Sequence, residues 1–311
     1  MSRTVVKVFA PASVANVGVG YDIMGFAING PGDEIILKKT SGKGLVIKEV
    51  TGAKNKLPLE IHKNTAGVAA YNLLKHLGLE DEGLEMSIHK KMPFGSGLGS
   101  SAASAAAGVF AVNELFKTGL TKRDILKFAV EGEQVADGAW HADNVAPSLL
   151  GGMTLIRDNE TLDVHKLYIP RALKAVVIYP HVKVLTKESR AILSENVTLK
   201  QHIKQAGNLG GFILGMYNSD FDLIQRSLED LIIEPQRAHL IPAFYEMKEK
   251  ALELGALGFS ISGAGPSMFA LSNNSFVCEN IVEAAKALYA KEKVEINTYI
   301  SDINNEGAFL Y

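Results

Sequence analysis

The sequence predicts an α+β protein built from two lobes, and three observations support this fold class. In the first half of the chain, β-rich runs joined by turn signals are mixed with helical segments. In the second half, once extra helices are set aside, the elements follow the order β-α-β-β-α-β, which is the ferredoxin-like order. Neither half alternates β and α strictly, as a doubly wound parallel sheet would. We expect an N-terminal lobe over residues 1–160 and a C-terminal lobe over residues 161–311.

The first lobe opens with β-rich runs and continues into a capped helix. Strands are expected at residues 5–9, 34–38 and 45–50. The segment Ser41-Gly42-Lys43-Gly44 separates the last two runs and predicts a hairpin between them. Residues 64–77 predict a helix, because Asn64 is a favoured N-cap residue and Gly78 follows the last apolar position.

A glycine-rich loop joins the next strand to the next helix. Residues 84–90 predict the strand, and the alanine-rich residues 102–116 predict the helix, since alanine has the highest helix propensity. Another helix is expected at residues 121–137, with Thr121 as its N-cap and Asp124 in its first turn. The first lobe therefore contains a strand, a glycine loop and a helix in succession.

The second half of the chain supplies the ferredoxin-like elements and additional helices. Strands are expected at residues 153–156, 164–169, 173–179, 259–262, 267–271 and 295–300. Helices are expected at residues 199–217, 222–231, 241–254 and 281–289. The segment Gly263-Ala264-Gly265-Pro266 predicts a hairpin between the fourth and fifth of these strands.

Composition restricts the class of protein. Of the 311 residues, 47% are apolar and 21% are charged, as in packed globular proteins and unlike disordered chains. The net charge is −2, so no global basic field attracts nucleic acid. No apolar run reaches the length of a membrane span, and the N-terminus lacks a signal-peptide core. The single Cys278 cannot form an intramolecular disulfide, which fits a reducing compartment, and we expect a cytoplasmic protein.

The strongest chemical signal is the loop Gly95-Ser96-Gly97-Leu98-Gly99-Ser100-Ser101, which opens the alanine-rich helix. Three glycines let the backbone approach a ligand closely, and the helix start offers N–H groups and a positive dipole end to a phosphate. Hydroxyls of Ser100 and Ser101 suit a phosphate oxygen or Mg²⁺. The loop matches neither the dinucleotide-binding motif nor the Walker A motif. The alternative is a structural turn in which Ser100 caps the helix.

A second glycine-rich turn, Ser262-Gly263-Ala264-Gly265-Pro266-Ser267, favours ligand binding over a purely structural turn, because two such backbones can line one site. The glycine loop with its flanking residues, from Pro93 to Ala103, resembles the phosphate-binding motif of the GHMP kinases. The glycine-rich turn at residues 262–267 resembles the third motif of that family, and residues 10–22 resemble its N-terminal motif. The three motifs stand in family order, and the family fold has two α+β lobes with a ferredoxin-like C-terminal part.

This resemblance implies ATP as the phosphoryl donor. The residues it assigns to the nucleotide are Asn64, Lys90, Pro93, Gly95, Ser96, Gly97, Leu98, Gly99, Ser100 and Ser101. For Lys90 and Asn64 the competing interpretations are a surface lysine and a helix cap.

Within the family, the segment His141-Ala142-Asp143-Asn144-Val145-Ala146-Pro147 resembles the homoserine kinases. The implied substrate is L-homoserine, whose side-chain hydroxyl would be phosphorylated. The carboxylate of homoserine suits a guanidinium, and the resemblance assigns it to Arg190 and Arg237. The ammonium suits a carboxylate, and the resemblance assigns it to Asp22. The full substrate-binding set is Asn16, Asp22, His141, Thr186, Arg190, Arg237 and Gly263. The competing interpretations are solvated arginines, a turn-forming Asp22 and a hydrogen-bonded His141.

The resemblance also implies a magnesium ion held by Ser101 and Glu133, since Mg²⁺ prefers hard oxygen ligands. Glu131 lies two residues away, about 200° around the same predicted helix, so only one of the two glutamates can face the site. We assign Glu131 as a solvated partner of Lys127. Asp143 and Asn144 are the predicted catalytic residues, but whether a protein base removes the hydroxyl proton stays open.

Two alternatives remain at this stage. One is a GHMP kinase for another small alcohol, such as mevalonate or a sugar. The other is a non-catalytic member that only binds a small ligand, although a metal pair would have no use there. Family members are commonly dimers, so a homodimer is expected, with no nucleic acid or membrane partner.

Overall fold

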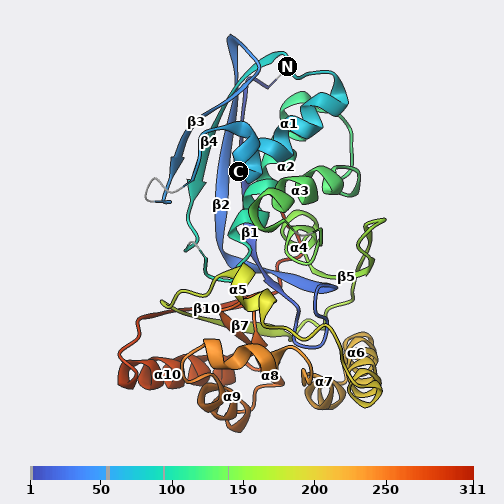
Figure 1. Cartoon of the computed structure of the whole chain (residues 1–311), viewed down its shortest axis with the longest axis vertical. Helices are drawn as coiled ribbons and strands as arrows, with labels where there is room; N and C mark the ends of the chain where they lie inside the picture. Colours follow the sequence, from blue (N-terminus) through green and yellow to red (C-terminus); the bar gives the residue numbers. More distant parts are fainter. Residues whose placement is uncertain (1–2, 54–56, 94, 139) are drawn as a thin grey trace.

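The computed structural model describes residues 3–53, 57–93, 95–138 and 140–311. Phe94, which belongs to the quoted phosphate-binding motif, lies outside the described residues. Two lobes are stacked along the long axis of the molecule, and both labelled chain ends lie in the first lobe (Figure 1). Among the described residues, no helix combines the length and the apolar character needed to cross a bilayer.

The first lobe is a seven-stranded sheet covered on one side by helices (Figure 1). Its strands are β1 (Val5–Ala15), β2 (Met24–Lys43), β3 (Leu45–Thr51), β4 (Glu82–Lys90), β5 (Met153–Asp158), β6 (Asp163–Lys166) and β11 (Phe309–Leu310). The order is β11-β1-β2-β4-β3, with β5 paired to β2 and β6 paired to β5. Its helices are α1 (Thr65–Leu77), α2 (Ser100–Phe116), α3 (Lys122–Asp137) and α4 (Val145–Leu150), with a 3-10 turn at Ile61–Lys63.

The predicted hairpin at residues 41–44 is wrong. β4 lies between β2 and β3, antiparallel to β2 and parallel to β3. The chain does turn back after Lys43, but the backbone groups of Gly44 bond to Asp81 and Leu84 at the start of β4. A third strand is therefore inserted between two strands that are neighbours in sequence.

Capping residues define the helices as the sequence predicts. Asn64 caps α1 through its side-chain oxygen, which accepts from the N–H groups of Ala66 and Gly67, and Gly78 ends the helix in the left-handed conformation. Thr121 and Asp124 form a reciprocal capping box at the start of α3. These interactions set the ends of α1 and α3, and both helices pack against α2 and against each other.

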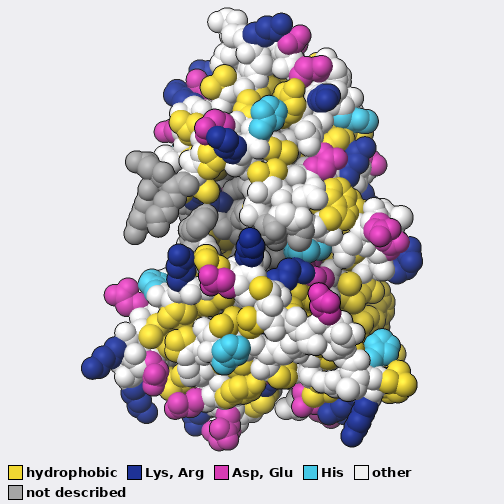
Figure 2. Space-filling view, in the orientation of Figure 1, with side chains coloured by type: hydrophobic (Ala, Val, Ile, Leu, Met, Phe, Trp, Pro, Cys, Tyr) yellow, Lys and Arg dark blue, Asp and Glu magenta, His cyan; other side chains and the backbone are white. Residues whose placement is uncertain are grey.

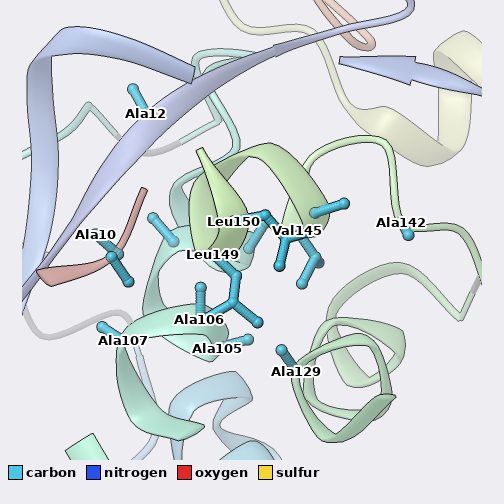
Figure 3. Packing of buried hydrophobic residues seen from close by; sticks show 14 of the residues in the cluster. Ala10, Ala12, Ala105, Ala106, Ala107, Ala129, Ala142, Val145, Leu149 and Leu150 are labelled. Carbon is cyan, nitrogen blue, oxygen red and sulfur yellow. The ribbon is translucent and has the colours of Figure 1, made fainter. Parts of the chain in front are cut away.

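Small side chains let α2 lie deep in the first lobe. Figure 3 shows Ala105 and Ala106 of α2 beside Leu149 of α4, with Ala107 on the side of Ala10 of β1. All three alanines have no exposed surface. Close packing at this density holds α2, and therefore the loop that precedes it, in one position.

The second lobe contains a four-stranded antiparallel sheet with the order β10-β7-β9-β8. Its strands are β7 (Lys174–Pro180), β8 (Gly258–Ile261), β9 (Met268–Ser272) and β10 (Ile296–Asp302). Its helices are α5 (Thr186–Ala191), α6 (Leu199–Asn218), α7 (Phe221–Ser227), α8 (Glu234–Arg237), α9 (Phe244–Glu253) and α10 (Ser275–Lys291), with a 3-10 turn at Ala238–Leu240. The chain order β7-α9-β8-β9-α10-β10 confirms the ferredoxin-like prediction.

Several element boundaries differ from the predicted ones. The helix predicted from residue 241 starts at Phe244, because Pro242 and the left-handed Ala243 (φ 53°) interrupt the helical backbone before it. The boundary predicted at residue 160 stays a prediction. Strand pairing puts β6, at Asp163–Lys166, and β11, near the C-terminus, in the first sheet.

Candidate active site

A cleft of about 610 Å³ lies at the junction of the two lobes, where Figure 2 shows Lys and Arg side chains in dark blue. Most residues of the predicted site line it: Asn16, Asp22, Asn64, Lys90, Gly95, Ser96, Gly97, Gly99, Ser100, Ser101, Glu133, His141, Asp143, Asn144, Thr186, Arg190, Arg237 and Gly263. Pro93 is not among the lining residues, and the Leu98 side chain is fully buried in the core. The sequence motifs therefore converge on one concave site.

The glycine loop packs directly against the turn between β8 and β9. Ser262 Oγ donates to the carbonyl oxygen of Gly97 at 2.7 Å, and the N–H of Ser267 donates to the carbonyl oxygen of Ser96 at 3.1 Å. Gly97 has a φ of +79°, and a Cβ there would lie 2.7 Å from the carbonyl oxygen of Gly265. Only glycine allows this approach, so the two glycine-rich segments form one joint between the lobes.

The start of α2 is open to an anion. Its N-cap is Gly99, in the left-handed conformation and without a capping side chain, so no side chain caps the first-turn N–H groups. The interpretation of Ser100 as the cap is wrong, because Ser100 is the first helical residue and its hydroxyl donates to Asp33 at 2.9 Å. Backbone N–H groups and the positive end of the helix dipole therefore face the cleft.

Lys90 and Asn64 differ from each other in their surroundings. Lys90 is 8% exposed and pairs with the fully buried Asp33, so its interpretation as a surface lysine is wrong. Burial lowers the pKa of Lys90, and the charge of Asp33 opposes that shift. Asn64 is confirmed as the cap of α1, and any contact that it makes with a nucleotide stays a prediction.

Two oxygen ligands lie together beside the start of α2. Ser101 Oγ donates to Glu133 Oε1 at 2.6 Å, and Glu133 is only 9% exposed. Both groups are hard oxygen donors that line the cleft, and this pair fits a magnesium ion that keeps further positions for water and phosphate. The predicted pairing of Glu131 with Lys127 is wrong. Glu131 accepts from Asn72 at 2.7 Å, and the Lys127 ammonium lies over the Phe128 ring.

Charged side chains alternate at the other end of the cleft. Arg190 forms a bidentate pair with Asp22, at 2.8 and 3.0 Å. Its Nη2 also lies 2.9 Å from His141 Nε2, while His141 Nδ1 lies 2.9 Å from Asp143 Oδ1. In the structure Arg190 and Asp22 bind each other, whereas the resemblance assigns them to opposite charges of the substrate.

Protonation of His141 competes with its contact to Arg190. Burial of the ring opposes protonation, but the hydrogen bond to Asp143 and the charges of Asp143 and Asp22 raise the pKa of His141 to about 9. Nε2 accepts from Arg190 only when the ring is neutral. The protonated ring and the Arg190–His141 hydrogen bond therefore exclude each other.

This shift predicts how stability depends on pH. Because the pKa of His141 rises from 6.5 to about 9 on folding, its contribution is complete below pH 6.5 and is lost as the pH rises through 9. A shift of this size corresponds to about 3 kcal/mol. Thermal unfolding measured across this range should show falling stability in the wild type and a shallower slope in His141→Gln. Parallel slopes in the two proteins would contradict the assignment.

Arg237 is buried and held by protein groups. It is 3% exposed, and it donates to the carbonyl oxygens of Ser189 at 2.8 Å and Gly263 at 3.1 Å, and to the hydroxyl of Tyr21 at 3.3 Å. The interpretation as a solvated surface residue is wrong for this arginine. The Arg237 guanidinium lies 5.1 Å from the centre of the Tyr21 ring, and that of Arg190 lies 5.6 Å from it.

Tyr21 is a residue that sequence reasoning missed. Its ring contacts both guanidinium groups, and such cation–π contacts stabilise cations that lie near each other. The signal was its position beside Asp22 in the N-terminal motif. Burial of Tyr21 and the charge of Asp22 raise the pKa of its hydroxyl, so the phenol stays neutral at physiological pH.

The turn that carries Tyr21 has an unusual backbone. Asn16, Val17 and Asp22 have φ values of 71°, 45° and 60°, in the left-handed region that a β-branched valine rarely adopts. The side-chain amide of Asn16 holds this turn, donating to the Gly263 carbonyl oxygen at 2.8 Å and accepting from the Asp22 N–H at 3.1 Å. Strained backbone of this kind concentrates at functional sites.

The predicted catalytic residues lie between the two ends of the cleft. Asp143 is 2% exposed, with one carboxylate oxygen bonded to His141. Asn144 occupies the N-cap position of α4 without a capping hydrogen bond from its side chain, which accepts from the Ser13 hydroxyl at 2.9 Å. Thr186 is exposed at the start of α5, four residues before Arg190. The cleft thus combines an anion site, two hard oxygen ligands, a buried carboxylate and paired guanidinium groups.

Family models match both lobes. The model of the GHMP kinases N terminal domain matches residues 64–152, and that of the GHMP kinases C terminal domain matches residues 205–291. The first match contains the glycine loop, Glu133 and the His141 segment.

Relatives match over nearly the whole length. Homoserine kinase of Chlorobium phaeobacteroides is 42% identical, covering 96% of this chain and 97% of its own. Homoserine kinase of Methanococcus vannielii is 39% identical, covering 96% and 99%.

Solved structures give the same result. The crystal structure of homoserine kinase from Cytophaga hutchinsonii has 45% identity and a TM-score of 0.97, covering 100% of this chain and 98% of its own. Mevalonate kinase of L. major, solved with R-mevalonate, shares the fold alone, with 18% identity, a TM-score of 0.73 and coverage of 97% and 99%. The chain therefore belongs to the GHMP kinase family, in which homoserine kinases resemble it from end to end.

Proposed function

We propose that this protein transfers the γ-phosphoryl group of ATP to the side-chain hydroxyl of L-homoserine, giving ADP and O-phospho-L-homoserine for threonine biosynthesis. The observation that carries this proposal is the polarity of one cleft. An uncapped helix start that suits phosphates lies at one end, and Arg190, Arg237 and Asp22, which suit an amino acid, lie at the other. Full-length similarity to homoserine kinases supports the same reaction.

The amino-acid end binds a zwitterion. Asp22 and Arg190 neutralise each other in the structure. A ligand with only one charge would separate this pair and leave one partner unmatched, which is unfavourable in a partly buried site. Homoserine carries both charges, so its carboxylate replaces Asp22 on Arg190 while its ammonium replaces Arg190 on Asp22. The charge balance of the cleft is preserved, and substrates without either group are disfavoured.

The phosphate end positions ATP. Backbone N–H groups of the loop and of the first turn of α2 hold the phosphate oxygens. Ser101 and Glu133 would hold Mg²⁺, which supplies charge neutralisation for the transferring phosphoryl group. As the hydroxyl oxygen of homoserine bonds to the γ-phosphorus, the bond to the bridging oxygen breaks and ADP leaves.

Asp143 connects the two ends. Its hydrogen bond orients His141, and its carboxylate lines the cleft with only 2% of the residue exposed. The transition state of phosphoryl transfer is loose, so the attacking hydroxyl becomes acidic only late. We therefore propose that Asp143 takes the proton late in the transfer and that its larger contribution is to hold His141 beside the substrate.

Substitution of Arg190 tests the substrate end. In Arg190→Leu the homoserine KM should rise about tenfold to a hundredfold, because a charge-assisted pair is lost, while ATP affinity stays unchanged. Arg190→Lys should restore part of this loss, since a point charge lacks the bidentate geometry. Steady-state kinetics with each substrate varied in turn measures both effects. Arg237→Leu should also lower the melting temperature, because Arg237 is buried with three protein acceptors.

A carboxylate-free analogue provides the control. 3-Aminopropan-1-ol has the ammonium and hydroxyl of homoserine but no carboxylate, so Arg190→Leu should not weaken its reaction. If the wild type phosphorylated this analogue as efficiently as homoserine, the carboxylate would not be recognised. That result would contradict homoserine as the substrate, and it would leave the membership in the kinase family unaffected.

Two other functions are distinguishable by assay. A kinase for another small alcohol would use homoserine poorly at millimolar concentration. A non-catalytic binder would release no ADP with any alcohol, and the adjacent Ser101 and Glu133 in the cleft argue against it.

Three further proposals follow from family resemblance and composition: a cytoplasmic location, a homodimer, and a division of the chain near residue 160.

A further inference from the structure

We infer that Asp33 and Lys90 form a buried ion pair that positions the first turn of α2, and so holds the N–H groups of the phosphate site without touching the nucleotide. Both are positioning residues for the proposed reaction, and the inference rests on ATP phosphates binding at the start of α2. The sequence resemblance assigns Lys90 to the nucleotide itself and gives Asp33 no role. The contacts of both side chains point to a different arrangement.

Asp33 connects three parts of the first lobe. It lies on β2 directly opposite Lys90 of β4 and has no exposed surface. One carboxylate oxygen accepts from Lys90 Nζ, from Ser100 Oγ at 2.9 Å and from Ser104 Oγ at 3.2 Å. Ser100 and Ser104 stand one helical turn apart at the start of α2. The carboxylate therefore ties the central strands to the first turn of this helix.

The second oxygen of Asp33 holds the chain that leads into the glycine loop. It accepts from the backbone N–H groups of Lys91 at 3.1 Å and Met92 at 3.4 Å. The loop begins only three residues after Met92. One buried carboxylate thus fixes the segment before the loop and the helix after it.

Lys90 has no donor left for a nucleotide. Its ammonium carries three N–H groups. They donate to Asp33, to the carbonyl oxygen of Ser100 at 2.7 Å and to Ser104 Oγ at 2.6 Å. A direct contact with phosphate or ribose would have to break one of these bonds inside a buried network.

A buried ion pair is a costly way to stabilise a fold, because apolar residues of similar size often serve equally well. Here the two charges hold polar groups that apolar residues could not hold: a helix-start carbonyl, two serine hydroxyls and two loop N–H groups. The position of backbone N–H groups matters for phosphoryl transfer, since a displacement of about 1 Å can reduce the rate a hundredfold. Positioning of the anion site accounts for the pair.

A double variant separates positioning from stability. Asp33→Asn and Lys90→Met should each lower the melting temperature, because each leaves one buried charge unmatched. Combined, they remove both charges, and most of the melting temperature should return. Affinity for a non-hydrolysable ATP analogue with Mg²⁺, measured by calorimetry, should nevertheless stay about tenfold to a hundredfold below wild type. The homoserine KM should not change.

A neighbouring ion pair is the matched control. Glu34 follows Asp33 on β2, and Lys91 follows Lys90 directly after the end of β4; the Lys91 side chain is 55% exposed and that of Glu34 14% exposed. This pair does not line the cleft. The double variant Glu34→Gln with Lys91→Met also removes one negative and one positive charge, and it should bind the analogue like the wild type.

Ser104→Ala keeps the test decisive if the double variant unfolds. It removes the hydroxyl that accepts from Lys90 and donates to Asp33, in a helix where alanine is well tolerated. We expect weaker binding of the analogue and a smaller fall in melting temperature than in either single charge variant, because only one buried N–H of Lys90 loses its acceptor. If Lys90 contacted the nucleotide directly, Ser104→Ala would bind like the wild type.

Three results would overturn this inference. One is a stable Asp33→Asn, Lys90→Met protein with wild-type affinity, which would leave the pair a purely structural role. Another is wild-type affinity in Ser104→Ala. The third is a wild-type protein that binds no nucleotide, which would overturn the proposed function as well and so is distinguishable from the first two.

Discussion

Replacing Glu133 with glutamine should reduce turnover about a hundredfold or more, because the variant loses a charged ligand for the Mg²⁺ that would neutralise the transferring phosphoryl group. Glu131→Gln should retain nearly wild-type turnover. The two glutamates share α3 but face different neighbours, Ser101 for Glu133 and Asn72 for Glu131. Turnover with saturating homoserine, measured over a range of Mg²⁺ concentrations, compares the two variants directly.

The magnesium dependence separates a metal ligand from a structural carboxylate. Glu133→Gln should need a higher Mg²⁺ concentration for half-maximal activity and should melt near the wild-type temperature. Equal damage from both substitutions would exclude Glu133 as the single carboxylate that faces the metal. If the loss of activity in Glu133→Gln did not depend on the Mg²⁺ concentration, Glu133 would be excluded as a metal ligand.

A valine at position 97 should abolish tight ATP binding, with an affinity loss of about a hundredfold, while the circular dichroism spectrum keeps its native shape. Gly97 has a φ of +79°, and its added Cβ would lie 2.7 Å from Gly265 O and 2.8 Å from Ser262 O. These carbonyl groups belong to the turn of the second lobe, so the loop must move. The strain should also lower stability by about 1–3 kcal/mol.

Gly119 offers a control for backbone strain. It has nearly the same φ, +78°, and nothing within 4 Å of an added Cβ. It does not line the cleft. Gly119→Val should therefore lose stability and keep its ATP affinity. Unfolding of Gly97→Val, shown by loss of the circular dichroism signal, would instead assign the loop a structural role.

Local signals in the sequence predicted those features whose causes are local. The ends of α1 and α3 follow from side chains that bond to backbone groups two or three residues away, as at Asn64 and Thr121. The glycine loop and the β8–β9 hairpin follow from residues that adopt positive φ. Each of these is decided within a few residues, which is the range that a pattern can report.

Strand neighbours could not be predicted in the same way. Nothing near Ser41-Gly42-Lys43-Gly44 indicates that β4, some forty residues later, enters between the two strands. β11 is only two residues long, so its sequence gives no periodic signal, and its partner β1 lies at the other end of the chain. Both outcomes depend on which apolar faces must be covered in the whole lobe.

The candidate site shows the same division. Most residues that the motifs named do line the cleft, but the motifs did not indicate which of them bind each other, as Arg190 does with Asp22 across 168 positions. A usable signal for Asp33 was present. It alternates with Ile35 and Leu37, both fully buried, so a period of two places its carboxylate on the inward face of β2. An acidic residue at an inward position needs partners, and Lys90 of β4 is the oppositely charged partner in the structure.

Coupled ADP release tests the central claim most directly. The wild-type protein is given ATP and Mg²⁺ with homoserine, threonine, serine, galactose or mevalonate in parallel reactions. We predict rapid ADP release with homoserine, at a kcat/KM well above that for each other alcohol, because homoserine alone places a hydroxyl of the right reach beside both charges of an amino acid. Preferential turnover of another alcohol, or no ADP release with homoserine, would contradict the assignment.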